Sequence, residues 1–149
     1  MKQKHFQYFI KVLKLTSKLS TCVSKHVACV LVKDNHILAT SYNGVASGIV
    51  HCNEVFGEEV LISVLARNKH HKWSNENEQH SEANLIAYCS KEGISTKNCI
   101  LFSSLSPCIA CAKMILASGI KDVYYLEEYD KDKDGIVFLK NNKVKIEIV

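Results

Sequence analysis

The sequence predicts an α/β fold in which helices cover a mixed five-stranded sheet whose first two strands form an antiparallel pair. Two strand-like segments, 27–32 and 36–42, are separated by a tight polar turn, as in a β-hairpin. Further along, the pattern changes to strand–helix–strand, which is typical of strands joined by helical crossovers. The length of 149 residues fits a single domain spanning 1–149.

The other elements follow from apolar spacing and from turn-forming residues. Helical spacing, with glycine as a stop signal, predicts three helices: 4–20, 81–92 before Gly93, and 107–118 before Gly119. Strand-like runs predict three more strands, the last at a sheet edge: 99–103, 123–126 and 143–149. The remaining segments are expected to be a loop at 43–57, a short helix at 58–67, a polar loop at 68–79 and a solvated charged turn at 130–135.

Composition excludes several classes of protein. The net charge of +4 suits a protein that handles a phosphate, but it is too small to indicate nucleic-acid binding. No apolar run is long enough to predict a membrane span, and lysines interrupt the N-terminal apolar stretch, which favours an amphipathic helix over a signal peptide. Seven cysteines, an odd number, favour metal ligation or simple burial over a disulfide scaffold.

One pair of motifs carries the predicted chemistry: His80-Ser81-Glu82, followed by Pro107-Cys108-Ile109-Ala110-Cys111. Cysteines three residues apart at the first turn of a helix place both sulfurs on one side, and the helix N-terminus favours their thiolate form. Pro107 suits the first position of such a helix, where an N–H group is not needed. One imidazole and two thiolates leave the fourth position of a tetrahedral zinc open, which is typical of a catalytic site.

Glu82 follows the histidine ligand by two residues, so it is expected beside the zinc-bound water without being a ligand itself. Zinc lowers the pKa of such a water, and Glu82 would carry its proton to a pyrimidine ring nitrogen and then to departing ammonia. H-x-E followed by P-C-x-x-C is the signature of the zinc nucleobase deaminases. Each half alone is weak, because a CxxC pair is often redox-active or structural and HxE is common by chance.

Several longer runs match a known family: 41–44 (SYNG), 73–82 (WSNENEQHSE), 105–108, 111–113, 118–121 and 128–131. On these residues the chain resembles the deoxycytidylate deaminases, particularly the phage type. The resemblance implies a three-layer α/β/α sandwich of the cytidine deaminase fold. It implies zinc-dependent hydrolysis of dCMP to dUMP and ammonia, which supplies thymidylate synthesis. It further implies that Asn43 contacts the nucleotide and that Tyr129 lies beside the substrate.

The resemblance also implies partners. Family members are typically homohexamers that dCTP with Mg²⁺ activates and dTTP inhibits, so a homo-oligomer, a hexamer, is expected. No nucleic-acid or membrane partner is expected. The expected location is the cytoplasm, or the host cytoplasm if the protein is phage-encoded. Tyr88 and Lys91 replace a phenylalanine and an arginine linked to allosteric control. Lysine keeps the charge but loses the planar fork of arginine, so weaker regulation is expected. Ser81 replaces the family's usual alanine.

A second, structural zinc is implied by four residues that match its ligands in phage-type members: Cys22, Cys52, His70 and Glu78. These residues fit no core periodicity and are expected in or beside polar loops, and two sulfurs, one nitrogen and one oxygen make a closed tetrahedral set. The neighbouring His51 and His71 are rival ligands, and a reduced cysteine pair with surface histidines is the alternative. Cys29, Cys89 and Cys99 are interpreted as buried small hydrophobic residues.

Two other functions compete with this hypothesis. A deaminase of the same fold would act on dCTP or on a base in tRNA or DNA, and the nucleic-acid enzymes need a basic face with aromatic side chains. The C-terminal third mixes acidic and basic residues evenly instead. A zinc-stabilised binding module without catalysis would have no need of Glu82.

Overall fold

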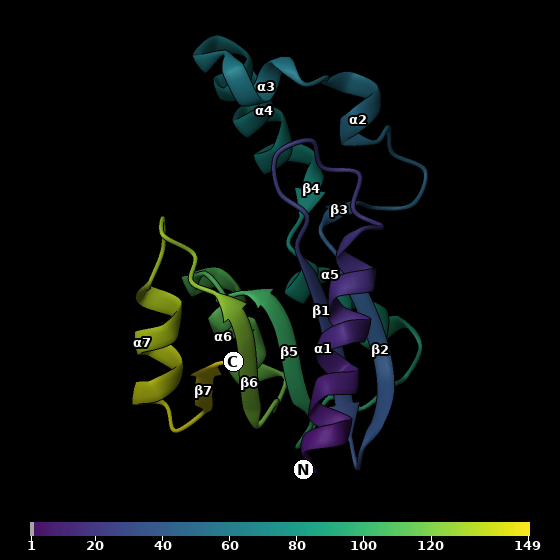
Figure 1. Cartoon of the computed structure of the whole chain (residues 1–149), viewed down its shortest axis with the longest axis vertical. Coiled ribbons are helices and arrows are strands. Elements are labelled where there is room, and N and C mark those ends of the chain that lie inside the picture. The colour runs from purple at the N-terminus through teal and green to yellow at the C-terminus, as the bar shows by residue number, and fades with distance from the viewer. Residues whose placement is uncertain (1) are drawn as a thin grey trace.

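In the computed structural model, which describes residues 2–149, a five-stranded sheet lies between one helix on one face and three helices on the other (Figure 1). The strands, in the order in which they lie side by side, are β2 (His36–Tyr42), β1 (Ala28–Lys33), β5 (Ile100–Leu105), β6 (Asp122–Glu127) and β7 (Lys145–Ile148). The four helices are α1 (Gln3–Ser17), α5 (Ser81–Lys91), α6 (Ile109–Ala117) and α7 (Asp134–Asn141). The predicted α/β/α sandwich is therefore confirmed.

One strand, β1, runs opposite to the other four strands of the sheet. β1 is antiparallel to both β2 and β5, whereas β5, β6 and β7 are parallel to one another. Parallel neighbours require crossover connections, and α6 and α7 supply them. The predicted antiparallel first pair and the edge strand near the C-terminus are both confirmed.

Each face of the sheet has its own apolar core, because side chains alternate along β1. Val30 and Val32 point to α1, where they are buried with Phe9 and Leu13. Leu31 points to the opposite face, in the core that contains residues of α5, α6 and α7. The three cysteines interpreted as small hydrophobic residues are buried on this second face, as predicted: Cys29, Cys89 and Cys99.

An arm extends from one end of the sandwich (Figure 1). It contains three further helices. Its elements are β3 (Gly44–Val45), α2 (Cys52–Val55), α3 (Glu59–Ile62), α4 (Val64–Asn77) and β4 (Glu78–Gln79). β3 and β4 form a separate two-stranded sheet. No helix within residues 2–149 is long and apolar enough to cross a bilayer.

The arm corrects three sequence predictions. The expected loop at 43–57 contains β3 and α2. The expected helix at 58–67 is broken at Ser63. The Ser63 hydroxyl accepts a hydrogen bond from the backbone N–H of Ala66 and so caps α4. The expected polar loop at 68–79 is mostly helical. Within α4 only His70 is buried, so the helix has no apolar stripe for periodicity to detect.

Two boundaries near the predicted zinc motif also differ. α6 begins at Ile109 with Cys108 as its N-cap residue, so Pro107 precedes the helix and the prediction of its place at the first helical position was wrong. The segment at 130–135 is not simply a solvated turn, because α7 begins at Asp134. The Asp132 carboxylate accepts the backbone N–H groups of Ile109 and Asp134, at 2.9 and 3.0 Å, which ties this turn to the starts of α6 and α7.

Candidate metal centre and adjoining cavity

His80, Cys108 and Cys111 lie close enough together to hold one metal ion. Nδ1 of His80 is 3.5 Å from Sγ of Cys108 and 3.5 Å from Sγ of Cys111. Tetrahedral zinc, with bonds of about 2.3 Å to sulfur and about 2.05 Å to nitrogen, separates two such ligand atoms by about 3.55 Å. The observed distances therefore fit a zinc ion with three protein ligands.

Two helix starts bring these ligands together. His80 is the N-cap residue of α5, Cys108 is the N-cap residue of α6, and Cys111 follows in the first turn of α6. Both helices present the positive ends of their dipoles to the cluster, which stabilises thiolate ligands.

Gly135 of α7 lies directly behind the cysteine-bearing turn. A Cβ at this position would overlap the carbonyl oxygen of Pro107 and lie 2.8 Å from the carbonyl group of Cys108. Only glycine allows α7 to approach the start of α6 this closely. The sequence places Gly135 at the end of the predicted charged turn, where this close approach could not be predicted.

The two thiols of the cluster have opposite acidities. Cys108 accepts a hydrogen bond from Cys111, and this bond lowers the pKa of Cys108 to about 4. The same hydrogen bond, together with burial, raises the pKa of the Cys111 thiol. The hydrogen bond with Cys108 also raises the pKa of His80. A bound cation would displace the protons that these ligands carry.

Glu82 is buried beside this cluster, with only 3% of its surface exposed. Burial raises the pKa of its carboxyl group above the usual value. A group tuned in this way takes up and releases a proton more readily near neutral pH than an exposed glutamate does. Its Oε2 accepts a hydrogen bond from the hydroxyl of Ser81 at 3.1 Å.

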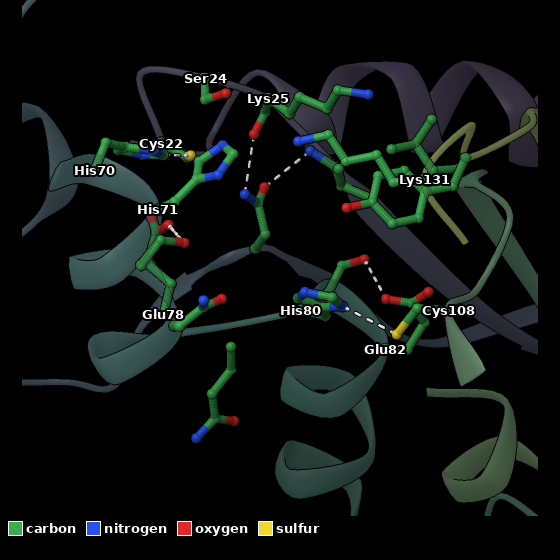
Figure 2. Close-up of a pocket in the computed structure, with 18 of the residues that line it drawn as sticks. Cys22, Ser24, Lys25, His70, His71, Glu78, His80, Glu82, Cys108 and Lys131 are labelled. Carbon is green, nitrogen blue, oxygen red and sulfur yellow. Dashed lines mark hydrogen bonds between the residues drawn. The ribbon is translucent and has the colours of Figure 1, made fainter. Parts of the chain in front are cut away.

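A cavity of about 310 Å³ opens over Glu82, His80 and Cys108 (Figure 2). This volume fits a small organic ligand. Figure 2 shows Lys25 and Lys131 on the opposite side of the cavity from Glu82 and Cys108. Neither lysine was predicted as a site residue: Lys25 lies outside every matched run, Lys131 only closes the run 128–131, and the chain contains many other basic residues. Their positions give the cavity one basic side and one side with metal ligands.

The two predicted substrate residues, Asn43 and Tyr129, both line this cavity. The side-chain amide of Asn43 is already engaged with the loop before β1. Its Oδ1 accepts the Ser20 hydroxyl and the Val27 backbone N–H, both at 2.8 Å, and its Nδ2 donates to the Lys25 carbonyl oxygen at 2.9 Å. Asn43 therefore holds the loop that carries Lys25, whatever contact it makes with a ligand. The Lys25 ammonium group lies 5.3 Å from the ring centre of Tyr129.

The four residues expected at a second zinc also come together: Cys22, Cys52, His70 and Glu78. One ligand atom from each lies within 4.8 Å of the others, and Sγ of Cys22 is 3.7 Å from Nε2 of His70. Glu78 Oε1 and His70 Nδ1 are buried without a hydrogen-bond partner among the described residues. A buried carboxylate oxygen without a partner is costly, so this donor set fits a bound cation.

The remaining candidates lie outside both clusters. His51 is exposed and contacts the Thr21 hydroxyl at 3.3 Å, and His71 is exposed and lines the cavity. Within residues 2–149, the second cluster of possible metal ligands includes neither of these rival histidines. Tyr88 and Lys91 are exposed on the last two turns of α5, and Lys91 pairs with Glu92 at 3.7 Å. Neither is among the residues described as lining the cavity.

Comparisons with known proteins agree with this geometry. The family model of the cytidine and deoxycytidylate deaminase zinc-binding region matches residues 2–127. The deoxycytidylate deaminase of Enterobacteria phage T4 is 34% identical to this chain, over 85% of this chain and 79% of its own length. The deoxycytidylate deaminase of Enterobacteria phage T2 is 32% identical, over 85% of this chain and 81% of its own length. The crystal structure of the dCMP deaminase of cyanophage S-TIM5 in complex with dCMP and dUMP matches with a TM-score of 0.82 and 31% identity, over 100% of this chain and 99% of that one.

Proposed function

Because the chain belongs to the cytidine and deoxycytidylate deaminase family, we propose that it catalyses the zinc-dependent hydrolysis of dCMP to dUMP and ammonia. One observation carries the proposal: the cavity has a buried carboxylate and a zinc-ligand cluster on one side and two lysines on the other. The match to a structure that contains both dCMP and dUMP supports the choice of substrate. The dUMP formed would supply thymidylate synthesis.

His80, Cys108 and Cys111 would hold the zinc, and Glu82 would move the protons. When bound, zinc supplies an acidified water that is nucleophilic near neutral pH. Glu82 takes a proton from the attacking water, gives it to the pyrimidine ring nitrogen and later helps to protonate the amino group, which leaves as ammonia. Burial suits Glu82 to this cycle, because a raised pKa brings its two protonation states closer in energy at neutral pH.

The basic side of the cavity is the proposed site of the substrate phosphate. Lys25 and Lys131 line the cavity opposite the metal cluster, so a nucleotide with its base at the cluster would extend its phosphate toward them. A phosphate gains charge-assisted hydrogen bonds from such groups. A nucleoside would leave both lysines without that partner, so the site is expected to discriminate against free deoxycytidine.

We also propose the second, structural zinc at the cluster of Cys22, Cys52, His70 and Glu78. Its four donors would fill the tetrahedral coordination of the ion, which leaves no position for a substrate. The cluster joins the loop before β1 to α2, α4 and β4 of the arm. Its role would be to order the loop that carries Lys25.

Regulation and assembly are proposed from the family resemblance alone. The chain would act as one domain, 1–149, within a cytoplasmic homo-oligomer, a hexamer. dCTP with Mg²⁺ would activate the enzyme and dTTP would inhibit it. Tyr88 and Lys91 are the proposed effector-responsive residues.

An ammonia-release assay tests the substrate. Purified protein would be compared on dCMP, dCTP, deoxycytidine and CMP, with Lys131→Ala beside the unchanged chain. We expect the highest kcat/KM on dCMP, and a loss in Lys131→Ala that is large on dCMP and small on deoxycytidine. Equal kcat/KM on dCMP and deoxycytidine would contradict a phosphate-binding site. Activity on adenosine in a tRNA stem-loop alone would favour the nucleic-acid deaminase.

A further inference from the structure

A row of small polar side chains crosses three neighbouring strands beneath the start of α5. Cys29 of β1 is paired in register with Ser41 of β2 and with Ser103 of β5. Residues paired across neighbouring strands share one face of the sheet, so all three point toward α5. Cys29 and Ser103 are fully buried, on a face whose neighbouring positions are apolar. Buried polar groups need partners, and the partner of this row is Ser81.

Ser81 joins the row to the proposed proton carrier. It is fully buried in the first turn of α5, and its Oγ lies 3.2 Å from Sγ of Cys29. The Ser41 hydroxyl donates a 2.7 Å hydrogen bond to the Ser81 carbonyl oxygen, which holds the backbone of this turn against β2. The Ser81 hydroxyl in turn donates to Oε2 of Glu82 at 3.1 Å.

We propose that Ser81 is a positioning residue that fixes the Glu82 carboxylate through Oε2 and leaves Oε1 to accept and return the proton. The inference rests on the proposed deamination, because it assigns Glu82 the proton transfers. Glutamate has several rotatable bonds, and proton transfer requires the acceptor oxygen to be held within a few tenths of an ångström. Alanine at position 81 would leave Glu82 without this donor, since its methyl group cannot form the hydrogen bond.

Ser81→Ala tests the proposal, with Ser103→Ala as the matched control. Both changes remove one buried hydroxyl near Cys29, but the described hydrogen bonds of the Ser103 side chain reach only Cys29, at 3.6 Å. We expect Ser81→Ala to lower kcat for dCMP about tenfold, the effect of one hydrogen bond to a charged group, with KM within about twofold. Ser103→Ala should keep kcat within about twofold. Ser81→Thr, which restores the hydroxyl, should recover most of kcat.

A second measurement does not depend on turnover. In a crystal structure of zinc-loaded Ser81→Ala, we expect the Glu82 side chain in more than one conformer, whereas Ser103→Ala should keep the single conformer. If the unchanged protein does not deaminate dCMP, the proposed function fails, but this comparison still decides the role of Ser81. One ordered Glu82 conformer in Ser81→Ala would overturn the positioning role. Equal losses of kcat in the two alanine variants would overturn it too, since they would indicate a packing effect.

Discussion

Glu82 carries out all the proposed proton transfers. Its side chain is buried in the first turn of α5, close to the ligand His80. Glu82→Gln keeps the volume and the burial but removes the group that accepts a proton. We expect zinc content to stay the same and kcat on dCMP to fall roughly 10²- to 10⁴-fold, the usual contribution of general acid–base catalysis. Ammonia release and metal analysis on one preparation measure both. Near-normal turnover would reject the assigned role and favour the binding module.

The buried thiols of the second cluster predict that zinc binding releases protons. Burial raises the pKa of Cys22, and burial raises the pKa of Cys52 to about 12. Both thiols therefore carry their protons at pH 7 in the metal-free protein, and both must lose them to become ligands.

We expect this second site to account for about two of the protons released when metal-free protein takes up zinc. Calorimetry in buffers of different ionisation enthalpy gives the number. Cys52→Ala, which removes the site, is the comparison. The same proton release from both proteins would contradict the cluster as a zinc site.

For single residues, the metal ligands could be predicted because each half of the signature lies within one helical turn. The spacing of Cys108 and Cys111 places both sulfurs on one side of α6, and the H-x-E signature identifies His80 as their partner. Lys25 and Lys131 could not be predicted. They meet only because two loops far apart in the sequence lie at the same end of the sheet. The further use of Asn43 to hold the Lys25 loop likewise depends on tertiary contacts.

Among the elements, the arm helices have the least apolar packing of their own. α4 buries only His70, and a helix that is polar on all sides needs other interactions to stay in place. The second metal cluster joins α4 and β4 to α2 and to the loop before β1, so it would replace the missing core.

Cys52→Ala therefore should lower the free energy of unfolding and increase amide hydrogen exchange in residues 44–79, because the arm loses its metal. Zinc should fall from two ions per chain to one, with the catalytic ion retained. The control is Cys99→Ala, an equally buried cysteine that belongs to neither cluster. About one zinc per chain in the freshly purified parent, unchanged by Cys52→Ala, would show that the second site does not exist.

The elements that pack on the core could be predicted from the sequence, and the helices of the arm could not. Helices and strands around the core could be predicted from apolar periodicity, since each buries one face. α4 could not, because its stability does not come from an apolar stripe, and the cap at Ser63 that starts it is a single side-chain contact. The start of α7 could not be predicted, because the charged run that leads into it is typical of a solvated turn. The Asp132 carboxylate in this run accepts backbone N–H groups at the starts of α6 and α7.

For the whole molecule, the prediction concerns assembly. The bend between α3 and α4 exposes four large apolar side chains by more than half of their surface: Leu61, Ile62, Val64 and Leu65. Exposed apolar groups of this kind are typical of surfaces that bind another protein, and here a second copy of the chain is the expected partner.

Sedimentation should accordingly show a multiple of the 16.8 kDa chain, with a hexamer expected. Ile62→Lys, at the most exposed of the four positions, should shift the distribution to smaller species, because a lysine in an apolar interface is costly. Val137→Lys, which changes an exposed apolar residue on α7 instead, is the control. A monomer alone at all concentrations would end the prediction of an oligomer.

Because Gly135 fits tightly behind the cysteine-bearing turn, α7 supports the backbone that carries two of the zinc ligands. A side chain there would push against the backbone of Pro107 and Cys108, so the position of two ligands depends on a segment that contributes none. The matched family region ends at residue 127, before this support begins. Zinc affinity should therefore respond to changes in the C-terminal segment, because a truncation or fusion that displaces α7 removes the support behind Pro107 and Cys108.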